Sequence, residues 1–274
     1  MSTDKDPRTL EQKRHHFEVE HELRERLLKS TRAERTKVFA DLYGELFRRV
    51  PDHPRLVRRD VEESDRRATE ARFRLLRGQL DGVKTFLEFA PGDCRLAWEV
   101  CKHVGKVIGV DISDQSGGHS KAPANFELVV YDGYTLNVPD NSVDMAYSYQ
   151  FIEHLHPEDI ELHFQAIHRV LRPGGVYIFD TPHSYSGPHD ISSWFTETPQ
   201  GFHFREWTYH DMAALLRKVG YAQWFVYRRA KPRFSWLFNQ LTYLAESLVG
   251  LLPYRLRKKI CQRLFVSVTM YVRK

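Results

Sequence analysis

The chain lacks the features that mark secreted and disulfide-rich proteins. Its 274 residues include only three cysteines, Cys94, Cys101 and Cys261, and no two of them have the C-x-x-C spacing of a metal or redox site. The first 16 residues are charged throughout and contain no apolar run of the kind that a secretory signal needs. We therefore expect a cytoplasmic protein with reduced thiols.

Acidic residues are nearly absent from the end of the chain. Residues 228–274 hold 11 Lys and Arg against one acid, Glu246, whereas residues 81–227 hold 10 against 19 and residues 1–80 hold 20 against 16. The formal net charge of +5 therefore combines an acidic middle with a strongly basic tail. This division suggests that chemistry and attachment to a surface belong to different segments.

Three segments differ in their pattern. Residues 1–80 read as a charged helical extension, which is either a solvated cap on the main domain or a separate binding module. Residues 81–230 alternate short apolar runs with helical stretches, which is typical of βαβ units and a parallel sheet. Residues 231–274 read as a basic, amphipathic helical insertion followed by a last strand.

These patterns predict an α/β fold with a doubly wound, mostly parallel sheet of seven strands. The turn RPGG at residues 172–175 is expected to end one helix and lead into the fifth strand. The predicted strands cover residues 85–89, 107–111, 127–131, 145–149, 176–180, 221–229 and 264–272.

The run TFLEFAPGDC at residues 85–94 reads as a strand, a tight turn and the start of a helix. Such a turn lets backbone N–H groups approach a ligand at the carboxyl edge of the sheet. The next strand ends at Asp111, whose carboxylate can accept hydrogen bonds from both ribose hydroxyls of an adenosine ligand. A helix N-cap is the alternative role for Asp111.

A dinucleotide would fit this arrangement nearly as well, but the glycines of its G-x-G-x-x-G fingerprint are missing. Ala90 and Arg95 stand where that fingerprint has its first and third glycine. Glu88 and Asp93 would repel a pyrophosphate, whereas they suit the amino group and the sulfonium of S-adenosylmethionine. The pattern therefore favours a cationic adenosine ligand.

Taken together, these motifs resemble those of class I S-adenosylmethionine-dependent methyltransferases. The runs LEFAPGD at residues 87–93 and VIGVDIS at 107–113 are similar to the first two motifs of that family. The resemblance extends over residues 83–230 and is closest to the broad branch that modifies quinones, sugars, lipids and other small molecules. It implies a Rossmann-like fold that binds S-adenosylmethionine. The later motifs, in the family's order, are DG at 132–133, DNSVD at 140–144, EHL at 153–155 and RVLRPGG at 169–175.

The resemblance also implies a set of cofactor-binding residues. The methionine part would be surrounded by Glu88, Ala90 and Gly92, and the ribose and adenine would be held and flanked by Asp111 and Ile112. The adenine amino group would bond to Asp132, with Gly133 beside it. The methionine end and the acceptor entrance would be faced by Tyr149 and Gln150.

Some of these assignments have alternatives. The family usually has glycine where Ala90 and Cys94 stand, and these departures would weaken cofactor binding. Asp132 could instead initiate a turn with Gly133.

Histidines gather after the fourth predicted strand. An acceptor that carries a proton must release it, and histidine titrates near neutrality. We predict His154 or His203 as the general base, with His183 and His189 behind them, against the alternative that each is a solvated or structural loop residue. Their spacing matches no known metal cage, so we predict no metal site.

Within the basic tail, leucines recur at helical spacing and precede the run RLRKK at residues 255–259. Residues 234–263 could lie on an anionic membrane surface and receive a lipid-linked acceptor, or could form a lid or a homodimer contact. No nucleic-acid module accompanies the cations, so we expect no nucleic-acid partner. The leucines are Leu237, Leu241, Leu244, Leu248 and Leu251.

The sequence therefore predicts an S-adenosylmethionine-dependent methyltransferase that acts on a small-molecule, saccharide or lipid-linked acceptor, at oxygen. Residues 148–151, SYQF, lack the Asn/Asp-Pro-Pro-aromatic loop of base-modifying enzymes, which argues against a nucleobase nitrogen as acceptor. Two alternatives are a nucleotide-dependent oxidoreductase that uses the same crevice and a non-catalytic partner protein that keeps the fold. We expect a cytoplasmic, membrane-associated location.

Overall fold

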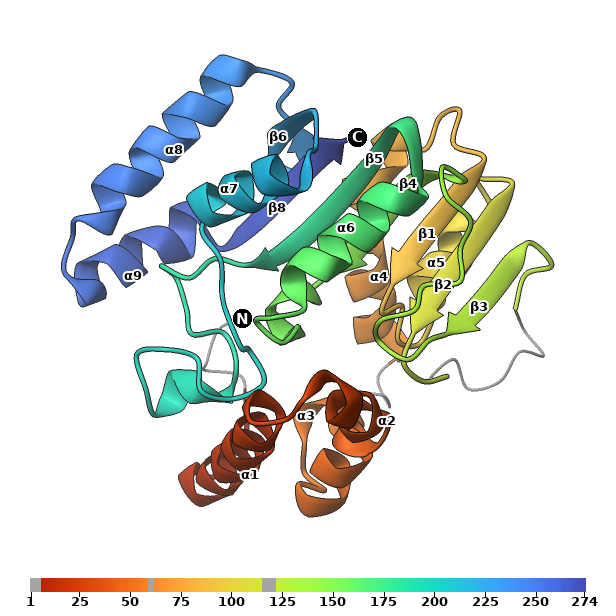
Figure 1. Cartoon of the computed structure of the whole chain (residues 1–274). Coiled ribbons are helices and arrows are strands. Elements are labelled where there is room, and N and C mark those ends of the chain that lie inside the picture. The colour runs from red at the N-terminus through yellow and green to blue at the C-terminus, as the bar shows by residue number, and fades with distance from the viewer. Residues whose placement is uncertain (1–5, 59–61, 115–121) are drawn as a thin grey trace.

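The computed structural model describes residues 6–58, 62–114 and 122–274. Its centre is a mixed, mostly parallel sheet of eight strands in the order β3-β2-β1-β4-β5-β8-β6-β7 (Figure 1). The strands are β1 (Thr85–Phe89), β2 (Lys106–Asp111), β3 (Phe126–Val130), β4 (Val143–Tyr149), β5 (Leu171–Pro182), β6 (Gln223–Arg228), β7 (Lys231–Pro232) and β8 (Ser267–Arg273).

The first five strands run parallel, and β8 enters antiparallel between β5 and β6. In β1, Phe86 pairs with Val107 of β2 and with Met145 of β4. Both faces of the central strands are buried, which explains why they read as nearly continuous apolar runs rather than as alternating ones.

Helices cover both faces of the sheet. On one face α6 and α7 pack over Leu87 and Phe89, and on the other α4 and α5 pack over Phe86. The parallel order and the two helical layers place the carboxyl ends of β1, β2 and β4 at one edge, where doubly wound folds bind ligands. These helices are α4 (Glu62–Leu76), α5 (Arg95–Val100), α6 (Ile160–Val170) and α7 (Tyr209–Val219).

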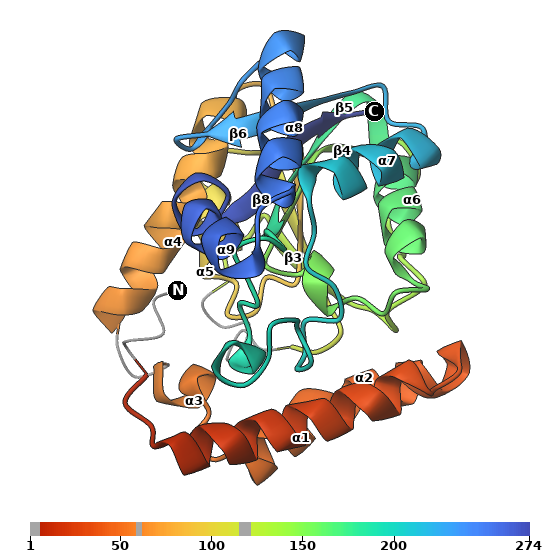
Figure 2. The same cartoon turned by 90° about the vertical axis from the view of Figure 1, so that its left-hand side faces the viewer.

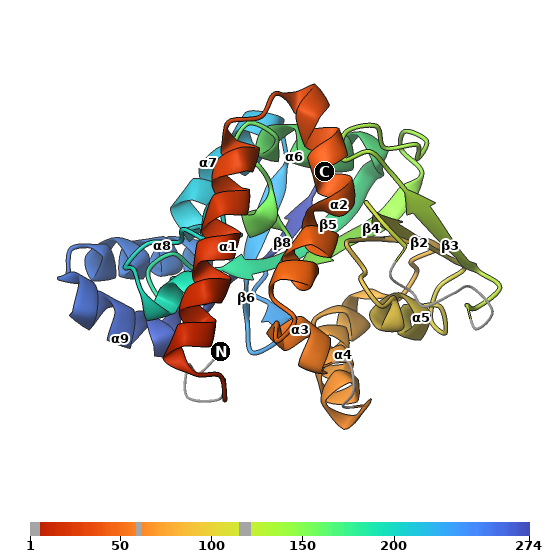
Figure 3. The same cartoon turned by 90° about the horizontal axis from the view of Figure 1, so that it is seen from below.

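Two N-terminal helices lie across that carboxyl edge (Figures 1 and 3). They are α1 (Leu10–Leu28) and α2 (Arg32–Arg49), each opened by a threonine capping box, and the short α3 (Pro54–Arg58) follows them. Their apolar faces enclose Phe202 and Phe204 of the loop before α7. The helices of residues 1–80 therefore form two separate parts. Helix α4 packs against α5 and the sheet, whereas α1 and α2 cover the carboxyl edge of the sheet.

The prediction of seven strands was one short. The extra strand, β7, has two residues and forms a tight hairpin with β6. The turn at residues 172–175 does not precede β5 but lies inside it, where Gly174 has a φ of 77° and the pairing with β4 shifts between Val143 and Met145. A bulge of this kind adds residues without ending the strand.

The insertion before the last strand forms two helices, α8 (Trp236–Gly250) and α9 (Tyr254–Leu264). They lie along the side of the molecule that holds β8 and β6 (Figure 2). Throughout the described ranges, no helix has both the length and the apolar character that crossing a membrane requires.

Candidate active site

The turn after β1 is built from residues in unusual backbone conformations. Ala90, Gly92 and Cys94 all have positive φ, at 51°, 57° and 59°. The Ala90 N–H donates to the carbonyl of Val110, at 2.8 Å, which ties the turn to the end of β2. The tight turn expected from the sequence is therefore present, with two non-glycine residues in the left-handed region.

Asp111 closes the other side of this turn. Its side chain is buried and accepts hydrogen bonds from the backbone N–H groups of Gly92, at 3.4 Å, Ile112, at 2.8 Å, and Ser113, at 3.4 Å. Burial raises the pKa of Asp111 even though these bonds favour the carboxylate. The carboxylate is thus fixed between the turn after β1 and the turn after β2, where it could accept hydrogen bonds from a ribose.

Glu88 lies beneath the turn and is 2% exposed. Among the described residues, its Oε2 atom has no hydrogen-bond partner. Burial raises the pKa of Glu88 to about 8; the charge of Arg72 opposes this shift, and the neighbouring carboxylates add to it. A buried carboxyl with an unused oxygen fits a cationic group of a ligand, because such a group would restore the charged form.

Asp132 follows β3 and is exposed. It accepts hydrogen bonds from the backbone N–H groups of Tyr134, at 2.8 Å, and Thr135, at 2.6 Å, and from the Thr135 hydroxyl, at 3.1 Å. These bonds lower the pKa of Asp132 and form the turn that was considered as the alternative role for this residue. Gly133, with a φ of 90°, lies close to Phe39 of α2, so the N-terminal helices reach this part of the site.

Tyr149 and Gln150 end β4 at the same edge. Tyr149 is 38% exposed, and the guanidinium of Arg72 lies 5.5 Å from its ring centre. Gln150 has a φ of 50°, and its side-chain amide donates to Asp180 Oδ1, at 2.7 Å. The amide nitrogen of Gln150 is therefore turned toward the sheet.

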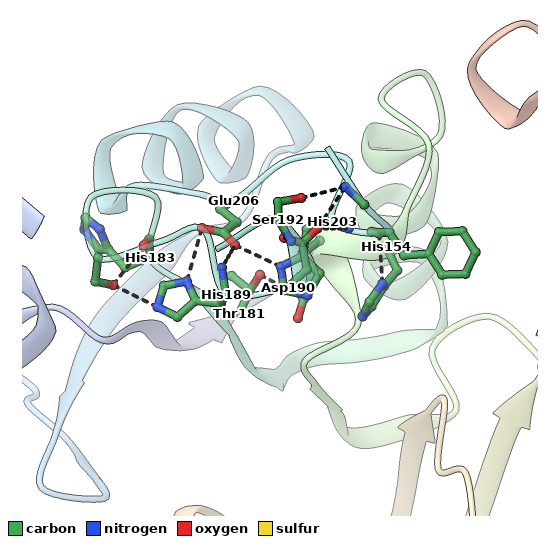
Figure 4. A network of polar contacts seen from close by, with 12 residues as sticks. His154, Thr181, His183, His189, Asp190, Ser192, His203 and Glu206 are labelled. Atoms are coloured by element: carbon green, nitrogen blue, oxygen red, sulfur yellow. Dashed lines mark hydrogen bonds and ion pairs between the residues drawn. The ribbon is translucent and has the colours of Figure 1, made fainter. Parts of the chain in front are cut away.

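Two predicted histidines meet beyond β4 (Figure 4). The rings of His154 and His203 are 4.9 Å apart, although the residues lie in η4 (Ile152–His154) and in the loop before α7. His154 Nδ1 is 3.0 Å from the Phe202 carbonyl, which can only accept, so Nδ1 carries the proton and Nε2 keeps its lone pair. Burial lowers the pKa of His154 to about 3, and the ring is neutral.

His203 is in the opposite state of charge. Its Nδ1 donates to Glu206 Oε1, at 2.9 Å. Burial by itself would lower the pKa of His203, but the bond to Glu206 and the surrounding carboxylates outweigh burial and raise it to about 9. Burial would likewise raise the pKa of Glu206, but bonds from His189 and His203 lower it to about 2.

Glu153 was not among the residues predicted for the site. It is fully buried, accepts a hydrogen bond from the Thr181 hydroxyl at 2.9 Å, and its Oε1 atom has no partner within the described part of the chain. Burial raises the pKa of Glu153 to about 7, against the positive charge of His203. Its neighbour His154 was predicted. The burial of Glu153 and its closeness to His203 could not be predicted from the local sequence, in which Glu153 resembles a helix cap.

His183 has no free ring nitrogen. Its Nε2 donates to Glu246 of α8, at 2.6 Å, and its Nδ1 accepts from the backbone N–H of Tyr185, at 3.1 Å. The side chain is fully buried. His183 thus connects the end of β5 to α8. Because both ring nitrogens are hydrogen-bonded, neither is available for the predicted role as a base.

Groups that could ligate a metal occur twice in the described residues. One set is Glu153, His154 and His203, whose ligand atoms lie within 4.8 Å of one another. A metal there would bind His203 through Nε2, because Nδ1 donates to Glu206, and it would have to displace the second proton of the charged ring. The other set consists of His16 and Glu20 of α1, which are hydrogen-bonded to each other, and of His53 before α3.

The N-terminal helices bind directly to the loop that carries His203. The Phe202 N–H donates to Glu20 Oε2 of α1, at 3.1 Å, and His21 Nδ1 lies 3.1 Å from the Gln200 carbonyl. These contacts join α1 to the loop before α7. The two helices therefore cover the cluster of Glu153, His154 and His203.

Comparison with known proteins agrees with this geometry. A family model described as a methyltransferase domain matches residues 87–179, from the Glu88 turn through β5. The matched segment is about a third of the chain and is similar to a methyltransferase domain. The relatives described next are named as S-adenosylmethionine-dependent or hold S-adenosylhomocysteine.

One curated relative of this methyltransferase domain is a probable S-adenosylmethionine-dependent methyltransferase of Mycolicibacterium smegmatis. It is 32% identical over 120 residues, which are 42% of this chain and 43% of that protein. The chain thus matches less than half the length of this relative.

Solved structures share the fold of the methyltransferase domain and its surroundings. An S-adenosylmethionine-dependent methyltransferase of Archaeoglobus fulgidus gives a TM-score of 0.52 at 18% identity, over 76% of this chain and 94% of that one. The 1,6-didemethyltoxoflavin-N1-methyltransferase of Burkholderia thailandensis, with S-adenosylhomocysteine bound, gives a TM-score of 0.56 at 17% identity, over 89% and 91%. At these identities the likeness is one of fold.

Proposed function

We propose that this chain is an S-adenosylmethionine-dependent methyltransferase that methylates an oxygen of a small-molecule, saccharide or lipid-linked acceptor. One observation carries the proposal. The edge of the sheet that holds Glu88 and Asp111 also holds Glu153, a carboxyl group with a pKa near neutrality, beside the charged imidazole of His203. The part with Glu88 and Asp111 suits a cationic adenosine compound, and the part with Glu153 suits the removal of a proton.

The cofactor end would be formed by Glu88 and Asp111. The unused Oε2 of Glu88 would accept from the ammonium group of the methionine part, and the fixed carboxylate of Asp111 would accept from the ribose hydroxyls. When bound, S-adenosylmethionine would supply an electrophilic methyl group on a sulfonium. Ala90 and Gly92 would line the turn with little side-chain bulk.

The acceptor end would be formed by Glu153, His154 and His203. At pH 7, Glu153 is poised to take the proton of an acceptor hydroxyl, because general bases work best with a pKa near the working pH. His203, held by Glu206, already carries its proton and would orient the acceptor oxygen as a donor. His154 would offer a second, weaker acceptor through Nε2.

The choice of oxygen is the finer part of the proposal. The relative of known fold from Burkholderia thailandensis is named as an N1-methyltransferase, and it shares the fold with this chain at 17% identity. A nitrogen acceptor that carries a proton would need the same base. A turnover assay over hydroxylated and amine-bearing acceptors therefore distinguishes the two.

Calorimetric titration tests the cofactor end. We expect S-adenosylmethionine and S-adenosylhomocysteine to bind and NAD not to bind. Asp111→Ala should lower the affinity at least about tenfold, because two ribose bonds are lost, while Asp140→Ala at an exposed carboxylate should leave it unchanged. Unchanged affinity in Asp111→Ala, or tight binding of NAD alone, would contradict the proposal.

Transfer of a radiolabelled methyl group tests the acceptor end. With an acceptor found in the screen, Glu153→Gln should lower kcat by about a hundredfold or more and leave the cofactor Kd unchanged, since only the proton acceptor is removed. A variant with normal kcat would remove Glu153 from the mechanism. Cofactor binding without turnover on any acceptor would instead favour a non-catalytic partner protein.

A further inference from the structure

The side of helix α8 that faces the protein carries buried polar residues beside partly buried apolar ones, which are Phe238, Tyr243, Ala245 and Val249. Asn239 is 5% exposed, accepts from the Val226 N–H at 3.1 Å and donates to the Trp224 carbonyl at 2.7 Å, so it satisfies the backbone of β6. Glu246 is 1% exposed and accepts from His183 Nε2 and from the Tyr209 N–H. Buried hydrogen bonds, rather than leucines, therefore fix the orientation of this helix.

The apolar face of α8 consequently points away from the protein. The leucine stripe predicted from the sequence is present on it, with exposures of 55–60% for four members and 83% for Leu251. Trp236, at the start of the helix, is 71% exposed. Monomeric soluble proteins rarely leave such a contiguous apolar surface in water, so this face has the character of a contact surface.

Cations border this apolar face at both ends. Glu246 is the only acid in residues 228–274, and it is buried on the inner side of α8. A dimer in which this face met itself would bring like charges together, because a twofold interface pairs a patch with its own copy. The exposed cations are Arg229, Lys231 and Arg233 before α8 and Arg255, Lys259 and Arg263 on α9.

We propose that the outer face of α8, with the cations beside it, docks this protein on an anionic lipid surface. The leucines and Trp236 would enter the boundary between headgroups and acyl chains, and the bordering cations would meet lipid phosphates. A helix of 15 residues lies in the plane of such a surface rather than across it. Charge complementarity distinguishes this partner from a second copy of the chain.

The inner side of α8, opposite the docked face, touches the loop that follows β5. Tyr185 in that loop lies against Gly250 of α8, and the guanidinium of Arg257 is 4.9 Å from its ring centre. Helix α8 would therefore lie between the lipid surface and this loop, which leads from β5 toward the acceptor side of the molecule. This last step rests on the proposed methyl transfer, but the docking itself does not.

Vesicle flotation of the full chain tests the docking. We expect the protein to float with vesicles of phosphatidylcholine mixed with phosphatidylglycerol at low salt, and about tenfold less with phosphatidylcholine alone or at high salt. Leu244→Glu combined with Leu248→Glu should weaken binding at least about tenfold, because two buried apolar contacts become charges. Removing one bordering cation, as in Lys259→Ser, should weaken it about fivefold.

Leu10→Glu is the matched control, because Leu10 is 59% exposed on α1, outside the docking face. It should float like the unaltered protein. The proposal is overturned if the unaltered protein does not float with the anionic vesicles, or if the double leucine variant floats equally well. It is also overturned if sedimentation shows a dimer that the double variant dissociates while lipid binding is absent. None of these measurements depends on methyl transfer, so a failure here is distinguishable from a failure of the proposed function.

Discussion

Ala90 and Cys94 show how single residues shape the cofactor turn. Both stand in the left-handed backbone region, which costs a residue with a Cβ atom about 1–2 kcal/mol. The resemblance to methyltransferases expects glycine at both positions, and the structure supplies the physical reason. The predicted departure from the family pattern is therefore a local strain, confined to the turn after β1.

Replacing Ala90 by glycine should stabilise the protein. Ala90 is exposed, so no packing is lost, and relief of the positive φ should raise the free energy of unfolding by about 0.5–1 kcal/mol. The matched control is Ala33→Gly, at an exposed position in the regular helix α2, which should lower it by about 1 kcal/mol. Urea unfolding measures both, and a loss of stability in Ala90→Gly as large as in the control would exclude strain at this turn.

At this scale the sequence predicted the turn after β1 and its neighbour Asp111 better than the cluster of groups beyond β4. The turn and Asp111 follow directly from local strand and turn patterns, and the structure brings them together. Glu153 was missed because its importance depends on burial and on His203, 50 residues later. His183 was predicted as a base because its partner Glu246 could not be known.

Arg35 fixes the position of helix α2. Its guanidinium is fully buried and donates to the Tyr134 hydroxyl at 3.1 Å and to Glu158 at 2.8 Å, and it pairs with Asp159 at 3.1 Å. Tyr134 follows β3, and the two acids precede α6. One side chain therefore ties the N-terminal cover to two loops of the ligand edge.

Arg35→Met should destabilise the protein by about 3 kcal/mol, because it removes the buried partner of the Asp159 carboxylate, which keeps only the half-exposed Arg32 and the Tyr134 hydroxyl. The backbone amides of α1 and α2 should exchange faster with solvent, since these helices lose their tie to the sheet. Arg48→Met on the same helix is the control: its pair with Asp41 is about two-thirds exposed, and its loss should cost less than about 1 kcal/mol. Urea unfolding and hydrogen exchange measure the effects; equal losses in the two variants would refute the role of Arg35.

The sequence predicted helices in residues 1–80 and in the basic tail, but not how these helices pack. The sequence suggests that the charged N-terminal helices are solvated, because no neighbouring residue indicates that an arginine such as Arg35 is buried. Arg35 meets Tyr134 and Asp159 only in the folded chain, 99 and 124 residues away. The sequence shows that a helix forms, whereas long-range contacts decide what it covers.

Over the whole molecule, three buried groups near the site make stability depend on pH in the same direction. The pKa is raised to about 8 for Glu88, about 7 for Glu153 and about 9 for His203. Because each value lies above that of the unfolded chain, each group stabilises the fold most at low pH. That stabilisation is lost as the pH rises through the folded values.

The melting temperature without ligand should therefore fall between pH 6.5 and pH 9. Over pH 6.5 to 8, Glu88 alone should lower the free energy of unfolding by about 2 kcal/mol, or about 5 °C in a chain of this size. Glu88→Gln should remove that part of the slope, while Glu197→Gln at an exposed carboxyl should not. Calorimetric melting measures the slope, and a profile unchanged in Glu88→Gln would contradict the burial of an unpaired carboxyl there.

The sequence by itself determined the parallel sheet, the tight turn after β1 and the basic, leucine-rich tail, because these follow from patterns within short stretches. Only the tertiary structure decided which acids and histidines meet and what charge they carry, because burial and the pKa depend on groups that are distant along the chain. The same holds for α8. Its leucine stripe is visible in the sequence, but the buried bonds of Asn239 and Glu246 turn that stripe outward.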